Sequence, residues 1–147
     1  MKKLLSLNIA TLLSLLTAVS SCSSFSDHDL ETGKKQKNLF ISGVAVDIAT
    51  GNPIEEIQIT MTATELYDSH EGRVVTKSTY TNNYGLYTIA AEGFSEPLTC
   101  IIKAEDPNGI YLPAASQEVK VSWQGMAYDD ASNTFFVNEC NFYMEKK

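Results

Sequence analysis

Histidine is scarce in this chain, and that scarcity limits the chemistry the chain can perform. The 147 residues include two histidines, His28 and His70. General-base and nucleophilic catalysis need a histidine, lysine or carboxylate positioned beside a group that it activates. His28 lies in a polar segment near the N-terminus, and His70 lies in a polar loop beside Asp68 and Glu71, where a solvated side chain is expected. We therefore predict that the chain is not an enzyme and holds no cofactor.

Two acidic clusters are the remaining candidates for a metal site. One comprises Glu105, Asp106 and Asn108, and the other is the pair Asp129 and Asp130. A calcium-binding loop alternates its oxygen ligands along the chain so that one loop encircles the ion. Neither cluster has this Asp-x-Asp-x-Asp-Gly spacing, and acids at strand ends are ordinarily solvated. The sequence predicts no metal site.

Three aromatic residues are the best candidates for a binding surface. Tyr111, Trp123 and Tyr128 fall in loops or at strand ends, where they could give a flat face for a sugar ring or an anchor for a protein partner. Trp123 ends an alternating strand, so packing at the edge of the core is the competing interpretation and the favoured one.

Cys100 and Cys140 form an even pair in the C-terminal half of the chain. Each alternates in phase with apolar residues of its own segment, so both thiols are predicted to point into the core. One alternative is a disulfide, which would close a loop of about 40 residues and stabilise the fold by roughly 4 kcal/mol if the Cα atoms lie within about 7 Å. The other alternative is two buried free thiols that act as small apolar residues. The sequence leaves both open.

The N-terminus has the pattern of an export signal. Lys2 and Lys3 precede a stretch over residues 4–19 that is apolar but interrupted by Ser, Asn and Thr. This stretch is too short and too polar to span a hydrocarbon core of about 30 Å. It ends in Val19-Ser20-Ser21-Cys22, which resembles the bacterial lipobox, with Val19 where leucine is usual. The resemblance implies that residues 1–21 are a helical signal peptide and that Cys22 is lipidated after cleavage.

Lipidation of Cys22 would attach diacylglycerol and usually a further acyl chain such as palmitate, which anchors a protein to a membrane without spanning it. Residues 22–38 then form a flexible tether, because their polar sequence has no apolar period. Acids soon after the lipidated cysteine resemble the signal by which Bacteroidetes-type bacteria export lipoproteins to the cell surface. We expect a lipid-anchored protein of the Gram-negative envelope, in the outer membrane, on its periplasmic or its cell-surface side.

The charge balance argues against a nucleic-acid partner. The chain has 11 Lys and Arg against 18 Asp and Glu, and removal of residues 1–21 takes two lysines away, so the net charge falls from −7 to −9. Binding to a phosphate backbone needs clustered Lys and Arg. With 44% apolar and 20% charged residues, the composition is that of a globular chain.

From residue 39 onward the sequence alternates with the period of β-strands. Ile57, Ile59 and Met61 fall on one face of a predicted strand, and Asn82-Asn83-Tyr84-Gly85 suits the turn of a hairpin. Seven segments have this character, at residues 39–47, 57–63, 74–81, 86–91, 98–105, 117–123 and 134–144. The sequence therefore predicts an all-β fold, a seven-stranded antiparallel Greek-key sandwich, as one domain over residues 39–147.

Two motifs in the first half resemble carboxypeptidase-regulatory-like, transthyretin-like (prealbumin-like) domains. Ile41-Ser42-Gly43-Val44-Ala45-Val46-Asp47, followed by Thr50-Gly51-Asn52-Pro53-Ile54, is similar to the family's first strand and its Thr-Gly-x-Pro turn. Thr81-Asn82-Asn83-Tyr84-Gly85-Leu86-Tyr87 is similar to its second signature, with Asn82 where an acidic residue is usual. The resemblance implies a transthyretin-like sandwich.

The second half resembles a narrower group, the lipoproteins named for their association with radical SAM enzymes. The matching runs are Glu105-Asp106-Pro107-Asn108-Gly109-Ile110-Tyr111, Glu118-Val119-Lys120-Val121 and Trp123-Gln124-Gly125. The extra acidic and glycine residues usual before the Asn-Gly pair are missing. The resemblance implies a radical SAM enzyme as a partner.

Enzymes related to this sandwich do not fit the sequence. Hydroxyisourate hydrolases need several histidines and an Arg-Gly-Ser tail, whereas this chain ends Tyr143-Met144-Glu145-Lys146-Lys147. Intradiol dioxygenases need two His and two Tyr around iron, and His28 in a tether cannot serve a buried metal site. We expect an accessory or structural envelope lipoprotein that acts through protein contacts. The alternatives are a substrate peptide modified by a partner radical SAM enzyme, or a carbohydrate-binding module; fold alone cannot choose among them.

Overall fold

The computed structural model describes residues 35–66, 71–95 and 97–147, and over these residues the fold is all-β. The predicted signal peptide, with Cys22 and most of the tether, lies outside the described residues. The described strands are β1 (Lys37–Asp47), β2 (Gln58–Leu66), β3 (Glu71–Tyr80), β4 (Leu86–Phe94), β5 (Leu98–Glu105), β6 (Gln117–Val121), β7 (Ala127–Asp129), β8 (Thr134–Val137) and β9 (Phe142–Met144).

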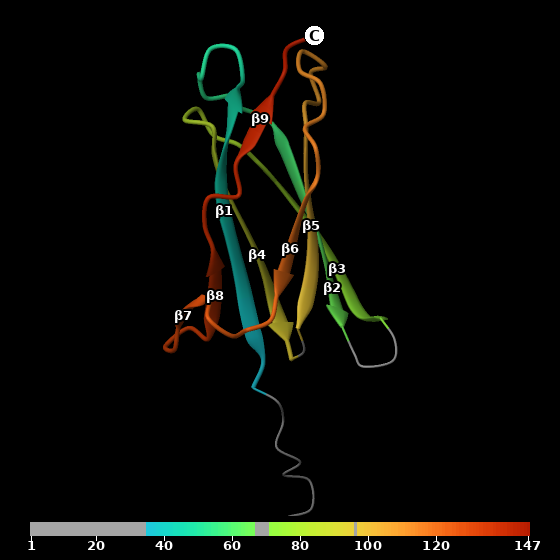
Figure 1. The fold of residues 1–147 in the computed structure, drawn as a ribbon, viewed down its shortest axis with the longest axis vertical. Helices are drawn as coiled ribbons and strands as arrows, with labels where there is room; N and C mark the ends of the chain where they lie inside the picture. The colour runs from blue at the N-terminus through green and yellow to red at the C-terminus, as the bar shows by residue number, and fades with distance from the viewer. Residues whose placement is uncertain (1–34, 67–70, 96) are drawn as a thin grey trace, which may run out of the picture. The chain divides into compact units, whose positions relative to one another are not determined.

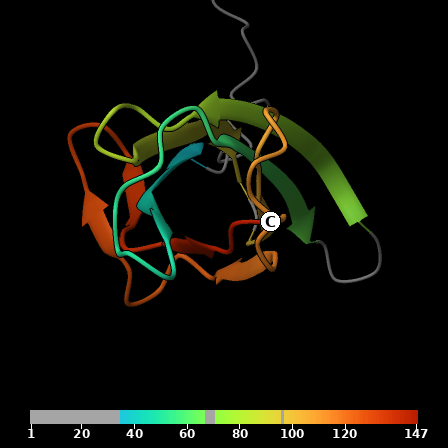
Figure 2. The same ribbon diagram turned by 90° about the horizontal axis from the view of Figure 1, so that it is seen from above.

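The strands form two sheets that face each other across the interior (Figures 1 and 2). The first sheet has the order β4-β1-β8-β7, and β9 also pairs with β1; the second sheet has the order β3-β2-β5-β6. All pairs of the second sheet are antiparallel, as are β1 with β4 and β7 with β8. The predicted all-β sandwich is confirmed.

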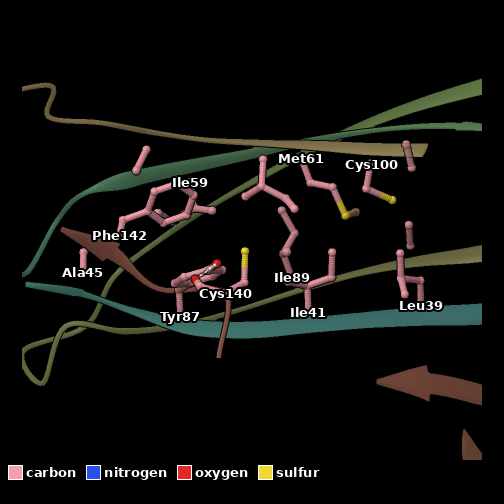
Figure 3. Close-up of a cluster of buried hydrophobic side chains, with 14 of the residues drawn as sticks. Leu39, Ile41, Ala45, Ile59, Met61, Tyr87, Ile89, Cys100, Cys140 and Phe142 are labelled. Carbon is pink, nitrogen blue, oxygen red and sulfur yellow. Dashed lines mark hydrogen bonds between the residues drawn. The ribbon is translucent and has the colours of Figure 1, made fainter. Parts of the chain in front are cut away.

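The core lies between the sheets and is built from alternate residues of each strand. Ile57, Ile59 and Met61 are 0% exposed, as their spacing predicted. Figure 3 shows Leu39 and Ile41 of β1 pointing toward the facing sheet, which carries Ile59, Met61 and Cys100. Removing such apolar surface from water is worth about 25 cal/mol per Å², which makes this layer the main source of stability.

The C-terminal part differs from the prediction of seven antiparallel strands. The segment predicted as one strand over residues 134–144 is two short strands, β8 and β9, and β7 has no counterpart among the predicted strands. Both β8 and β9 pair with β1 in the parallel direction. Between them the chain leaves the regular ladder at residues 138–141, where the Cys140 N–H donates to the Ser42 carbonyl at 3.0 Å and the Val44 N–H donates to Asn141 Oδ1 at 3.1 Å.

Gly43 makes room for this irregular segment. A Cβ atom at Gly43 would lie 2.0 Å from the carbonyl oxygen of Cys140 and 2.9 Å from Cε1 of Tyr87. The Tyr87 hydroxyl donates to the same carbonyl at 2.5 Å. The close approach of two backbone segments therefore requires glycine at this position.

The motif residues at the end of β1 hold the connection to β2. The Asp47 carboxylate accepts hydrogen bonds from the turn that follows it, including the Thr50 N–H at 3.1 Å. The Thr81 hydroxyl donates to the Ile54 carbonyl at 2.7 Å and accepts from the Ile57 N–H at 2.9 Å. In this chain, residues that carry the family resemblance fix the path of a loop.

Candidate functional site

The structure brings together two of the three predicted aromatic residues. Trp123 and Tyr128 both pack on Phe135, with ring centroids 4.7 and 4.4 Å from it, beside the start of β1. Tyr111 lies at the other end of β1, where its hydroxyl donates to Asp47 at 3.3 Å. The three residues therefore do not form one binding surface.

Trp123 is packed at the edge of the core. The ring is half-buried, and the Lys37 ammonium lies 5.2 Å from its centroid. The indole N–H is buried and has no acceptor among the described residues, and the backbone φ of 65° is unusual for a bulky residue. The Tyr128 hydroxyl donates to Asn133 Oδ1 at 2.6 Å. These contacts favour the core-edge role over an open platform for a sugar ring.

The predicted acidic clusters take part in turns. Asp106 accepts the N–H groups of Asn108 at 2.8 Å and Tyr111 at 2.9 Å. Burial raises the pKa of Asp106, but these hydrogen bonds outweigh it and the pKa lies below its ordinary value. The Ser132 hydroxyl and N–H likewise lower the pKa of Asp129. Within the part of the chain that the structure describes, no group of three His, Cys, Asp or Glu side chains could hold a metal ion.

Cys100 and Cys140 are both buried, and both are free thiols in the structure. Burial, with a smaller contribution from Cys140, raises the pKa of Cys100 to about 12. Burial also raises the pKa of Cys140, and this effect outweighs the hydrogen bond with Tyr87, which lowers the pKa. The Cys140 thiol donates to Gln117 Oε1 at 3.1 Å. Figure 3 shows the two side chains at separate places in the core. Of the two alternatives that the sequence left open, the structure has the two free thiols and not the disulfide. A neutral buried thiol is a poor nucleophile.

A surface that the sequence analysis did not single out lies on the outer side of the first sheet. Val44 pairs with Leu86 of β4, and Val46 pairs with Tyr143 of β9, and all four side chains point away from the core. Leu86 is 49% exposed and Tyr143 is 61% exposed. We call this surface the apolar face; it comprises Phe40, Val44, Val46, Ile48, Leu86, Phe136 and Tyr143.

The apolar face runs along most of β1. Near its start Phe40 contacts Phe136 of β8, with ring centroids 5.7 Å apart. A polar row of Ser42 and Thr88 follows, and beyond it the surface is apolar as far as Ile48, which is 63% exposed. The more exposed part therefore lies toward the end of β1.

The outer side of the second sheet has a different chemistry. Its inner strand β2 presents threonines, whose hydroxyls form hydrogen bonds with residues of β3. The Thr60 hydroxyl lies 3.0 Å from that of Ser78, and the Thr62 hydroxyl lies 3.3 Å from that of Thr76. The exposed apolar residues Val74 and Tyr80 lie on this outer side among hydroxyl groups. The apolar face differs because its apolar residues gather on neighbouring strands, which makes it a candidate contact surface.

Acidic residues border the apolar face. Glu145 follows Tyr143 by two residues and is exposed, and Glu92 lies on the outward side of β4 at the opposite end. Glu139 is exposed in the segment between β8 and β9, which runs along the edge of β1. None of these three carboxylates forms an ion pair with a residue that the structure describes.

The sequence does contain a signal for this surface. The run over residues 39–46, Leu-Phe-Ile-Ser-Gly-Val-Ala-Val, is apolar at nearly every position, not only at alternate ones. Such a run is typical of a strand covered on both faces. One side of β1 packs on the core, and the other side carries Phe40, Val44 and Val46 on the apolar face.

Comparison with known proteins finds similar folds but no matching family model and no matching curated protein. The chain is similar in structure to 3-chlorocatechol 1,2-dioxygenase from Rhodococcus opacus 1CP, with 12% identity and a TM-score of 0.54 over 78% of this chain and 62% of that one. It is similar to chlorocatechol 1,2-dioxygenase from Pseudomonas putida, with 12% identity and a TM-score of 0.51 over 75% and 61%. A third similar structure is the shaft pilin SpaA from Lactobacillus rhamnosus GG, with 14% identity and a TM-score of 0.46 over 76% and 51%.

The dioxygenase likenesses concern the fold alone, because function resides in sites and not in the sandwich that carries them. The chain spans less than two thirds of the length of each of these proteins. The domain is an all-β sandwich of two facing sheets. Among the described residues there is no helix with the length and apolar character to span a bilayer.

Proposed function

We propose that this chain is a lipid-anchored, non-enzymatic protein of the Gram-negative envelope that acts through contact with another protein. The observation that carries the contact role is the apolar face, where Leu86, Tyr143 and Ile48 leave about half or more of their surface in water. Contiguous exposed apolar residues with a polar rim mark interaction sites in soluble domains.

The proposed anchor is compatible with access to this surface. The tether would join the domain at the start of β1, through Lys35 and Lys37, whereas the most exposed apolar residues lie toward the end of that strand. A flexible tether of this length reaches roughly 20–24 Å. A domain held in this way keeps the end of β1 free to meet a partner.

The non-enzymatic part of the proposal is supported by the state of the reactive groups. The thiol of Cys100 is buried with a raised pKa, and the carboxylates of Asp47 and Asp106 accept hydrogen bonds from their own turns. A nucleophile or a general base needs an activating neighbour and access to substrate.

A second candidate is a substrate of a radical SAM enzyme, which rests on the motif resemblance over residues 105–125. Ile110 and Tyr111 of this segment are held by N–H bonds to Asp106 at 2.6 and 2.9 Å and stay exposed or half-buried. Intact mass spectrometry of the protein from its native cells tests this candidate. A mass that equals the lipidated sequence, with no further change, would exclude it.

The anchor is tested by replacing Cys22 with alanine in the full chain. We expect the variant to leave the membrane fraction and to lose labelling with an alkynyl palmitate analogue, because Cys22 is the proposed site of acylation. Cys100→Ala is the matched control, and it should keep both membrane association and label. Labelling that persists in Cys22→Ala would contradict the lipoprotein assignment.

The contact role is tested by placing the photo-crosslinking residue p-benzoylphenylalanine at exposed positions of the full chain in its native cells. We expect at least one position to give an adduct with a second envelope protein. If every exposed position fails to give a protein adduct, the proposed contact role is wrong.

A further inference from the structure

Resting on the proposed contact role, we infer that the apolar face binds one amphipathic, cationic segment of a different protein. The geometry points to a helix or strand that carries apolar residues on one side and Lys or Arg beside them. Three properties of the apolar face lead to this occupant: its dimensions, the acidic charges at its border, and the repulsion between those charges in a dimer formed through this face.

The dimensions suit a single segment. From Phe40 to Ile48 the surface is about 26 Å long, at about 3.3 Å per residue, and the polar row of Ser42 and Thr88 divides it. It is about 10 Å wide, because it covers two interstrand spacings of about 4.8 Å. A footprint of roughly 260 Å² is well below the approximately 800 Å² per partner that a stable interface between domains buries. It corresponds to one side of a helix or to a short strand pair.

The charges on the outward side of the first sheet are acidic. Glu92, Glu139 and Glu145 border the apolar face, and the outward positions of β1, β4, β8 and β9 include no Lys or Arg. Lys35 pairs with Asp130 at 3.6 Å, Lys147 acts on Asp106, and Lys37 lies over the Trp123 ring. Two further cations lie near the ends of the apolar face: Arg73 of β3 donates to the Gly93 carbonyl beside Glu92, and Lys146 is exposed next to Glu145. A partner that supplies Lys or Arg would meet unpaired carboxylates, which favours its approach and its orientation.

The same charges disfavour the two other occupants. In a twofold dimer through this surface, both ends of the strip are acidic, so carboxylates face carboxylates whichever way the copies align. An anionic bilayer attracts basic segments and repels an acidic rim. A cationic amphipathic segment of another protein can pack its apolar side on the strip and pair its Lys or Arg with the carboxylates at the border.

The experiment places p-benzoylphenylalanine at Tyr143 in the full chain, expressed in its native cells and irradiated there. Tyr80 is the matched control position, because it is also a tyrosine, is 56% exposed and lies on the outward side of β3 in the other sheet. The adduct is digested and the partner's crosslinked peptide is sequenced by mass spectrometry. The crosslink is then repeated in the E139K/E145K background, with Glu105→Lys as the charge-reversal control on the other sheet.

We expect an adduct from Tyr143 to a different protein, with Lys or Arg flanking apolar residues in the crosslinked peptide. Charge reversal at Glu139 and Glu145 should lower the yield about tenfold, because two attractive rim contacts become repulsive, and Glu105→Lys should leave it unchanged. A circular-dichroism spectrum equal to that of the unaltered protein confirms that the variant is folded.

Several outcomes would overturn the inference. They are an adduct with a second copy, an adduct with lipid, a partner peptide without basic residues, or a yield that charge reversal does not change. If Tyr80 gives a protein adduct and Tyr143 gives none, the contact role stands and the assignment to the apolar face fails. If neither position nor any other exposed position crosslinks to protein, the proposed function itself fails.

Discussion

Replacement of Gly43 by alanine should destabilise the domain, although the usual effect of this substitution has the opposite sign. Gly43 does not have a positive φ, so alanine fits its backbone conformation. At such a position Gly→Ala ordinarily stabilises by about 0.4–1 kcal/mol, because it restricts the unfolded chain. Here the added Cβ would lie 2.0 Å from the Cys140 carbonyl oxygen and 2.6 Å from its carbon, which are backbone atoms and cannot rotate away.

The magnitude follows from what must move. Relief of the clash displaces residues 138–141 from β1 and breaks the bond from the Tyr87 hydroxyl to Cys140 at 2.5 Å and that from the Cys140 N–H to Ser42 at 3.0 Å. Overpacking costs about 1–3 kcal/mol, and leaving a buried polar group unpaired costs about 1–3 kcal/mol more. After the opposing gain of about 0.4–1 kcal/mol is subtracted, we expect a net loss of about 1–5 kcal/mol for Gly43→Ala.

Urea unfolding followed by fluorescence measures this loss, because Trp123 is the one tryptophan of the chain and packs on Phe135. Gly51→Ala is the control: its φ is +71° and a Cβ there meets nothing within 4 Å, so it isolates the cost of left-handed backbone, about 1–2 kcal/mol. Tyr87→Phe should cost less in the Gly43→Ala background than alone, since the bond it removes is already broken. Equal costs in both backgrounds, or a Gly43→Ala variant as stable as the parent, would refute the reasoning.

Three further predictions concern the core. Ile59→Ala should lower the unfolding free energy by about 2–5 kcal/mol, the range for a buried aliphatic side chain, and a loss below about 0.5 kcal/mol in urea unfolding would mean that the residue is not buried. Thiol titration of the unfolded, unreduced protein should count Cys100 and Cys140 as two free thiols. Because burial raises the pKa of Cys100 from 9.0 to about 12, the folded protein keeps this proton to higher pH than the unfolded chain. The associated stability is present below about pH 9 and is lost as the pH rises toward 12, by about 1.4 kcal/mol per unit, and Cys100→Ala should flatten this decline.

The core strands could be predicted from the sequence because their signal is local. Ile57, Ile59 and Met61 alternate with polar residues, and that period alone assigns one side of the strand to the interior. The turn residues Thr81 and Asn82 were visible for the same reason, since a turn depends on the few residues that form it. Burial of Cys100 and Cys140 also followed from their phase with apolar neighbours.

The arrangement of the C-terminal strands depends on contacts distant in sequence. Periodicity over residues 134–144 predicted one strand, but pairing with β1 divides it into β8 and β9 and sets both parallel. The break occurs where Cys140 approaches Gly43, a contact between residues about a hundred positions apart that no local pattern contains. The separation of Tyr111 from Trp123 and Tyr128 has the same origin, since chain connectivity does not say at which end of the sandwich a loop lies.

By itself, the sequence determined which residues of this protein share a face and where its chain turns, because both depend on neighbours along the backbone. Only the tertiary structure decided which faces are covered. Phe40, Val44 and Val46 have the apolar character of core residues, and the sequence cannot distinguish a second buried side of β1 from a side left open. The two sheets enclose a single core, so the outward side of β1 has no layer over it among the described residues, and the apolar face with its acidic border results from that packing.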